Sequence, residues 1–240
     1  MTIPAANPVA VEVTRGQSLE TAFVESRHRA SCAVVAADGT IVHGWGDIEQ
    51  QVFPRSAIKP IQALPLIETG AADAFGYSAA EISLACASHH AEDRHINTVT
   101  DILGRIGLTP DALECGPKIS IDEAVKIERL KKGVEARRLG SDCSGKHTGF
   151  LATAVHMGED PAGYIGRSHP VQQRIFQTIS EMCDVDVSTL PEGIDGCSIP
   201  ALAIPLSALA LGMAKLANPT GLGAVREAAA DRVVQSIAAE

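Results

Sequence analysis

Patterns typical of β-strands are confined to the first fifty residues of this chain, and helical patterns fill the rest. Residues 9–15, 23–26, 31–36 and 40–45 are predicted strands, and the Asp38-Gly39 pair between the last two is a strong hairpin signal. From Ser56 onward we expect helices, over residues 78–87, 92–106, 121–132, 144–157, 169–183, 200–217 and 223–239. Strands followed by helices predict an α+β fold rather than alternating βαβ units.

Composition limits the classes of partner. The chain has 240 residues, 45% of them hydrophobic and 20% charged, which is enough to bury a core in one large domain or two small ones. Aromatic residues make up only 3%, so the core must consist of Ala, Leu, Ile and Val. The formal net charge is −9, and there are no basic patches with interleaved aromatic residues. Both features argue against nucleic acid or an anionic membrane as a partner.

Residues 1–7 have no basic region followed by an apolar core, so we expect no secretory signal and a cytoplasmic protein. The longest apolar run, residues 199–217, contains Pro200 and Pro205 and is short for a membrane span. We interpret it as a buried helix. The six cysteines are widely scattered, which in a cytoplasmic chain favours reduced core thiols or metal ligands over a disulfide framework.

The segment Pro54-Arg-Ser-Ala-Ile-Lys-Pro60 contains a serine three residues before a lysine. At the start of a helix this spacing places Ser56 and Lys59 on one face, one turn apart. A neutral lysine amine there can take the proton of the serine hydroxyl and make it a nucleophile. Taken alone the pattern is weak, because a solvated helix start with the same residues is the commoner interpretation. In Cys86-Ala-Ser-His89, Ser88 is either a second pocket hydroxyl or part of an ordinary helix end.

A second group of reactive side chains occurs in Asp142-Cys-Ser-Gly-Lys-His147 and in Asp195-Gly-Cys197. Cys143 and Lys146 lie on one helical face, and thiolates are soft ligands that suit zinc. Two thiolates, a third ligand and a water would form a tetrahedral open site. Lysine is an unusual third ligand, because it must be deprotonated to bind a metal. The alternative is that both cysteines are plain core residues.

Nucleotide binding is a rival interpretation of the same segment. Gly140, Gly145 and Lys146 match most of a phosphate-binding loop. However, His147 stands where a serine or threonine should bind magnesium, and the preceding residues 131–138 are too charged for the buried strand that such a loop requires. The sequence therefore gives little support to a nucleotide site.

Together these motifs resemble, in order along the chain, the Rhizobium-type asparaginase II family, which is distinct from the bacterial asparaginases with a threonine nucleophile. The resemblance covers essentially all 240 residues, and we expect a single domain over residues 1–240. It implies an α+β fold like serine β-lactamases and glutaminases, with an antiparallel sheet flanked by helices and a helical subdomain. It also implies a homodimer that hydrolyses L-asparagine to aspartate and ammonia. The segments that carry the resemblance are Val11-Glu-Val-Thr-Arg-Gly16, Glu25-Ser-Arg-His28, Pro54–Pro60, Cys86–His89, Cys143–His147 and Asp195–Cys197.

The resemblance also implies roles for individual residues. Ser56 and Lys59 correspond to a first serine–lysine pair, and Ser88 to the serine of a second pair. The zinc ligands implied are Cys143, Lys146 and Cys197. The side chains expected at the substrate are Arg55, His147 and Asp195.

The chain departs from the family pattern in two segments and in length. His90-Ala91 replaces a common Ser-Gly, and Ser141-Asp142 replaces a common Asn-Asn. Family members continue well beyond 240 residues, so the resemblance implies that the lysine partner of Ser88 and further strands are missing here. We therefore expect this chain to be inactive alone. A related serine–lysine hydrolase, glutaminase or β-lactamase-like, and a non-catalytic zinc-stabilised binding domain remain as alternatives.

Overall fold

The structure is a computed structural model that describes residues 7–240. Within this range eight strands pair in twos into small antiparallel sheets: β1 with β2, β3 with β4, β5 with β8, and β6 with β7. The strands are β1 (Val9–Arg15), β2 (Phe23–Arg29), β3 (Cys32–Val35), β4 (Ile41–Trp45), β5 (Gln51–Val52), β6 (Glu192–Ile194), β7 (Pro200–Leu202) and β8 (Ile204–Pro205).

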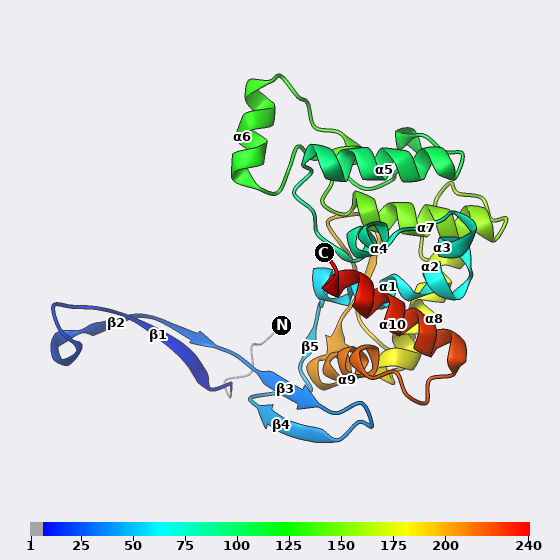
Figure 1. The fold of residues 1–240 in the computed structure, drawn as a ribbon. Coiled ribbons are helices and arrows are strands. Elements are labelled where there is room, and N and C mark those ends of the chain that lie inside the picture. Colours follow the sequence, from blue (N-terminus) through cyan, green and yellow to red (C-terminus); the bar gives the residue numbers. More distant parts are fainter. Residues whose placement is uncertain (1–6) are drawn as a thin grey trace.

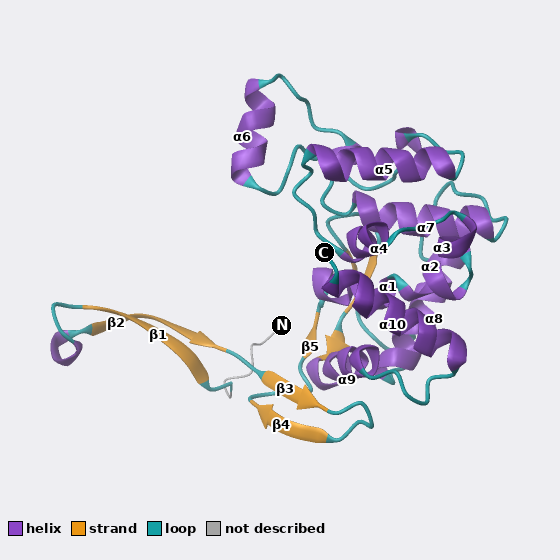
Figure 2. Ribbon diagram, in the orientation of Figure 1, coloured by secondary structure: helices purple, strands orange, loops and turns teal. Residues whose placement is uncertain are grey.

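Helices make up the body of the molecule (Figures 1 and 2). The α-helices are α1 (Lys59–Gln62), α2 (Leu64–Glu68), α3 (Ala71–Ala74), α4 (Ala79–Cys86), α5 (Asp93–Arg105), α6 (Glu123–Lys131), α7 (Ser144–His156), α8 (Pro170–Cys183), α9 (Leu206–Ala217) and α10 (Ala224–Ala238). Short 3-10 turns are η1 (Leu19–Thr21), η2 (Arg55–Ile58), η3 (Pro110–Ala112) and η4 (Arg138–Gly140). The α+β class is confirmed in this coarse form, whereas the likeness to β-lactamases stays a prediction.

Helix α7 lies at the centre of the body, and every residue from Ser144 to Ala154 is buried. It packs against α2, α3, α4, α5 and α8. Glycine allows the close crossing with α4, because a Cβ at Gly145 would lie 2.6 Å from the carbonyl oxygen of Leu84. The surrounding core is mainly aliphatic, as the scarcity of aromatic residues requires, with Leu64, Ile82 and Leu151 fully enclosed. This crossing fixes where α4 ends relative to where α7 begins.

The first two hairpins are less enclosed than the helices. The β1–β2 hairpin projects away from the body, whereas the β3–β4 hairpin lies beside α9 (Figure 1). Large apolar side chains of β1 and β2 are therefore open to solvent, and Phe23 is 81% exposed. None of the helices between residues 7 and 240 has both the length and the apolar character required to cross a membrane.

Two sequence predictions are wrong. The apolar run at residues 199–217 is not one helix, because β7 and β8 precede α9, which begins only at Leu206. Pro200 and Pro205 explain this, since proline lacks an N–H and interrupts a helical hydrogen-bond ladder. The strands are consequently not confined to the N-terminal part. Instead β8 pairs with β5, with Ile204 opposite Val52, which brings the segment before Ser56 beside the loop between β6 and β7.

Candidate active site and metal-ligand cluster

Ser56 and Lys59 lie in a tight turn between β5 and α1. Arg55 has a left-handed φ of 49°, and Ser56 follows it in η2. Pro60 occupies the first turn of α1, where its missing N–H leaves no hydrogen bond unmade. The Ser56 side chain is exposed, whereas Lys59 is only 2% exposed because α1 packs against α4 and α8. The turn thus presents a hydroxyl to solvent and buries an amine.

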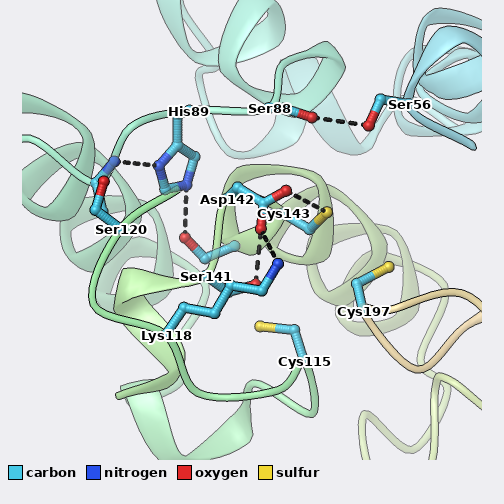
Figure 3. A network of polar contacts seen from close by, with 12 residues as sticks. Ser56, Ser88, His89, Cys115, Lys118, Ser120, Ser141, Asp142, Cys143 and Cys197 are labelled. Carbon is cyan, nitrogen blue, oxygen red and sulfur yellow. Dashed lines mark hydrogen bonds and ion pairs between the residues drawn. The ribbon is translucent and has the colours of Figure 1, made fainter. Parts of the chain in front are cut away.

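Ser88 joins these two side chains. It follows α4, whose capping residue Ala87 turns the backbone into an extended conformation. The Ser88 hydroxyl lies 2.9 Å from the Ser56 hydroxyl (Figure 3). The Lys59 amine donates to Ser88 Oγ at 2.7 Å and to the Ala87 carbonyl oxygen at 2.8 Å. The helical spacing predicts that Lys59 can reach Ser56 directly, but the hydrogen bonds run from Ser56 through Ser88 to Lys59. The end of α4 supplies the acceptors that a buried amine requires.

A cluster of metal-ligand atoms lies at the start of α7. One ligand atom each from Cys143, Asp195 and Cys197 falls within 4.8 Å of the others. Lys146 Nζ donates to Cys197 Sγ at 3.2 Å, and the Cys197 thiol donates to Asp195 Oδ2 at 3.1 Å. The fold therefore brings together Cys143, Lys146 and Cys197, which the sequence predicts as zinc ligands, and places Asp195 among them.

The cysteines differ in acidity according to their surroundings. A hydrogen bond from Cys197 lowers the pKa of the Cys143 thiol to about 6, although burial opposes this. The same hydrogen bond, followed by burial, raises the pKa of Cys197. Burial also raises the pKa of Cys86 and Cys183 to about 12. The site therefore favours a thiolate at Cys143, and thiolates are the form of cysteine that binds metals.

The donor set of this cluster fits a zinc ion. Two sulfur atoms and a carboxylate oxygen are all common zinc ligands, and these atoms lie within 4.8 Å of one another. Burial opposes ionisation of Asp195, but the hydrogen bond with Cys197 and the positive charges of Lys146 and Arg55 together hold the pKa of the carboxyl below its ordinary value. The Asp195 carboxylate can therefore bind a metal ion, or accept a hydrogen bond from the thiol of Cys197.

An ion pair connects the turn that contains Ser56 and Lys59 with the metal-ligand cluster. Arg55, beside the candidate nucleophile, lies 3.4 Å from Asp195, beside the candidate metal ligand Cys197. The Arg55 side chain is 69% exposed, so solvent screens this pair and its guanidinium remains accessible. Ser198, which follows Cys197, has a left-handed φ of 76°. Both loops therefore contain a non-glycine residue in a costly conformation, a feature common at functional sites.

His147 lies behind the cluster. It is fully buried, and Nδ1 lies 2.6 Å from the hydroxyl of Tyr164, which accepts a hydrogen bond from the Glu114 N–H at 2.9 Å. Burial, with a smaller effect from Lys146, lowers the pKa of His147 well below its ordinary value, so the ring is neutral. Contact of His147 with substrate stays a prediction.

Sequence reasoning missed a polar network beside the site. Lys118 pairs with Asp142, whose other carboxylate oxygen lies 3.6 Å from the Cys143 sulfur (Figure 3). Burial opposes ionisation of Asp142, but Lys118, together with Lys59 and a backbone hydrogen bond, lowers the pKa of the carboxyl. No spacing signal could reveal Lys118, because it meets Asp142 through an isolated β-bridge between residues 118 and 137.

A cavity of about 430 Å³ opens beside Ser88. Its wall includes His90, Arg94 and His95, together with the small side chains of Ser83 and Thr98. Ser88 therefore lines this cavity and is also hydrogen-bonded to Lys59.

Comparison with known proteins identifies the family of the chain. No curated protein sequence matches the chain. The model of the L-asparaginase II family matches residues 11–240, which include all the candidate catalytic and metal-binding side chains. A match over nearly the whole chain indicates a hydrolase of the asparaginase type, acting on a small molecule. The chain belongs to the L-asparaginase II family.

Proposed function

We propose that this protein hydrolyses L-asparagine to L-aspartate and ammonia through an acyl-enzyme on Ser56. The single observation that carries the proposal is the hydrogen-bonded chain from the exposed Ser56 hydroxyl, through Ser88, to the buried Lys59 amine. Amide hydrolysis needs an accessible nucleophile and a positioned base. The hydrogen-bonded series Ser56–Ser88–Lys59, called the relay below, offers both.

The proton path follows from the contacts. Ser56 Oγ attacks the side-chain carbonyl carbon of the substrate and passes its proton to Ser88, while the Ser88 proton moves to Lys59 Nζ, a step that requires a free lone pair on this nitrogen. The proton then returns by the same path to the nitrogen of the departing ammonia, and an ester on Ser56 remains. A water molecule attacks this ester, with Lys59 and Ser88 again taking its proton, and the aspartate leaves as Ser56 regains its hydrogen.

Two charged side chains are suited to hold the ends of an amino acid. The exposed guanidinium of Arg55 can bind a carboxylate in a bidentate manner, and the Asp195 carboxylate can bind an ammonium group. They already lie 3.4 Å apart, so both can reach one small substrate. Cys143, Lys146 and Cys197 would hold a zinc ion. When bound, this ion would polarise or orient a substrate oxygen.

The test is release of ammonia from L-asparagine and L-glutamine, run beside hydrolysis of a β-lactam. In a form of the protein that includes the continuation implied by the resemblance, we expect turnover of asparagine, and we expect Ser56→Ala, Ser88→Ala and Lys59→Met each to lower kcat by about 10²–10⁴-fold. Ser83→Ala is the matched control, because Ser83 lines the same cavity but makes no contact in the relay.

Preference for glutamine or the β-lactam would instead support a related serine–lysine hydrolase. Zinc binding without any turnover would support a binding domain. Near-normal turnover by Ser88→Ala would show that the proton does not pass through Ser88.

A further inference from the structure

His89 makes several contacts that hold the loop after Ser88 against the start of α7. Its Nδ1 accepts a hydrogen bond from the Ala91 N–H at 3.1 Å, and its Nε2 lies 2.8 Å from the Ser144 hydroxyl. Its backbone N–H donates to the carbonyl oxygen of Asp142 at 3.1 Å. Figure 3 shows the His89 ring with a hydrogen bond at each of its two nitrogens. The His89 side chain is only 4% exposed, so these contacts are shielded from water.

The contacts determine where the ring carries its proton. Burial, followed by the neighbouring His95, lowers the pKa of His89 to about 4, so the ring is neutral at pH 7. Because Nδ1 accepts from a backbone N–H, the one ring hydrogen is on Nε2. Nε2 therefore donates to Ser144 Oγ, which in turn donates to the Leu139 carbonyl oxygen at 3.1 Å. With this tautomer, each donor from the Ala91 N–H to the Ser144 hydroxyl meets an acceptor.

The loop would not hold this shape without such support. Ala91 is fully buried and has a left-handed φ of 58°, which is unfavourable for a residue with a Cβ. The hydrogen bond from the Ala91 N–H to the His89 ring is a direct constraint on that conformation. Ser88 immediately precedes this constrained turn, so its hydroxyl position depends on the turn.

We propose that His89 is a positioning residue, which fixes Ser88 for proton transfer by clamping its loop to Ser144 in the first turn of α7. His89 touches neither Ser56 nor Lys59 among the hydrogen bonds of residues 7–240. Its effect on the reaction is therefore indirect, through the placement of Ser88 between them. Since Ser144 follows Cys143, the same clamp connects the relay to the helix that carries the candidate metal ligands.

This inference rests on the proposed proton relay, and two variants separate the bonds made by the ring. His89→Asn keeps an oxygen that can accept from the Ala91 N–H, as in an Asx turn, but it is too short to reach Ser144. His89→Gln places an amide N–H near the position of Nε2 but offers Ala91 no equivalent acceptor. Ser144→Ala removes the other partner of the clamp without changing His89.

The readouts are kcat and KM for L-asparagine, the labelling rate of Ser56 by a fluorophosphonate, zinc content, and the ¹⁵N NMR spectrum of the histidine rings. We expect His89→Asn and Ser144→Ala each to lower kcat and the labelling rate by about 10–100-fold, the loss expected when the Ser88 hydroxyl is displaced by about 1 Å. KM and zinc content should not change. His89→Gln should recover part of the rate. The double variant His89→Asn/Ser144→Ala should lose no more than either single variant, because both remove the same bond.

Retention of the wild-type labelling rate by Ser144→Ala would overturn the proposal, as would losses that add in the double variant. A wild-type ring protonated on Nδ1 would also overturn it. If His89→Asn does not fold, Ser144→Ala and His89→Gln still decide the question. Fluorophosphonate labelling without ammonia release from asparagine would refute the proposed substrate and leave the clamp testable, so the two failures are distinguishable.

Discussion

Replacing Gly145 with alanine should disturb both stability and the relay. A Cβ at this position would lie 2.6 Å from the Leu84 carbonyl oxygen and 2.7 Å from the Leu84 Cγ. Ordinary contacts begin near 3.4 Å, so α4 and α7 must separate by about 0.8 Å. The nearest atom is part of the backbone, so a rotamer change cannot relieve the clash.

The expected magnitude follows from two opposing effects. Overpacking of this kind costs about 1–3 kcal/mol, whereas alanine in a helix is favoured over glycine by about 0.5–1 kcal/mol. The net loss should be about 1–2 kcal/mol in the free energy of unfolding, or a fall in Tm of roughly 2–8 °C for a chain of this size. Because Ser88 directly follows α4, a shift of this size should also lower kcat by up to about 10²-fold.

Thermal unfolding and ammonia release from L-asparagine measure the two effects. The matched control is Gly104→Ala in α5, because a Cβ at Gly104 meets no atom within 4 Å. That variant should gain up to about 1 kcal/mol from helix propensity and keep its activity. If Gly145→Ala is as stable as Gly104→Ala, the close crossing of α4 and α7 does not constrain the fold as argued.

Two other predictions follow from the site. Elemental analysis should find one zinc ion per chain, and Cys143→Ser should lose most of it, whereas Cys183→Ser, which alters a thiol outside the cluster, should keep it. Acid should destabilise the fold between pH 6.5 and about 4, because the folded-state pKa of His89 is lowered to about 4 and only the unfolded chain takes up the proton at higher pH. His89 should account for about 3 kcal/mol of the loss in urea titrations, measured as the difference between the pH profiles of the wild type and His89→Asn, and identical profiles would contradict this assignment.

The sequence predicts the long helices well, because their information is local. The box formed by Ser78 and Glu81 begins α4, and the predicted ends of α5 and α8 agree with the structure within about two residues. The sequence does not predict strands β7 and β8, for the opposite reason. They are two or three residues long, and β8 is defined by pairing with β5, about 150 residues earlier. No local pattern carries that information.

In the candidate site, too, the sequence predicts what depends on local motifs and misses what depends on long-range packing. The motifs indicated which side chains are reactive, and the fold brings Cys143 beside Cys197 as the zinc hypothesis requires. The partner of Lys59 was predicted differently, because helical spacing points to Ser56 and cannot reveal that α4 ends beside the amine. The ion pair of Lys118 with Asp142 likewise depends on a chain crossing rather than on spacing.

A single turn cannot easily supply both an exposed nucleophile and a buried base. Residues three apart share one face, so a substrate that reaches Ser56 would also bring water to a lysine pointing the same way. Here the turn presents Ser56 to solvent and directs Lys59 inward, to 2% exposure, and this separates the two groups. A second hydroxyl from another element is then necessary to connect them, and Ser88 occupies that place. The geometry of proton transfer thus depends on how α4 and α7 pack. Neither Gly145 nor His89 contacts substrate in the proposed reaction, so variants at these two positions test this dependence directly.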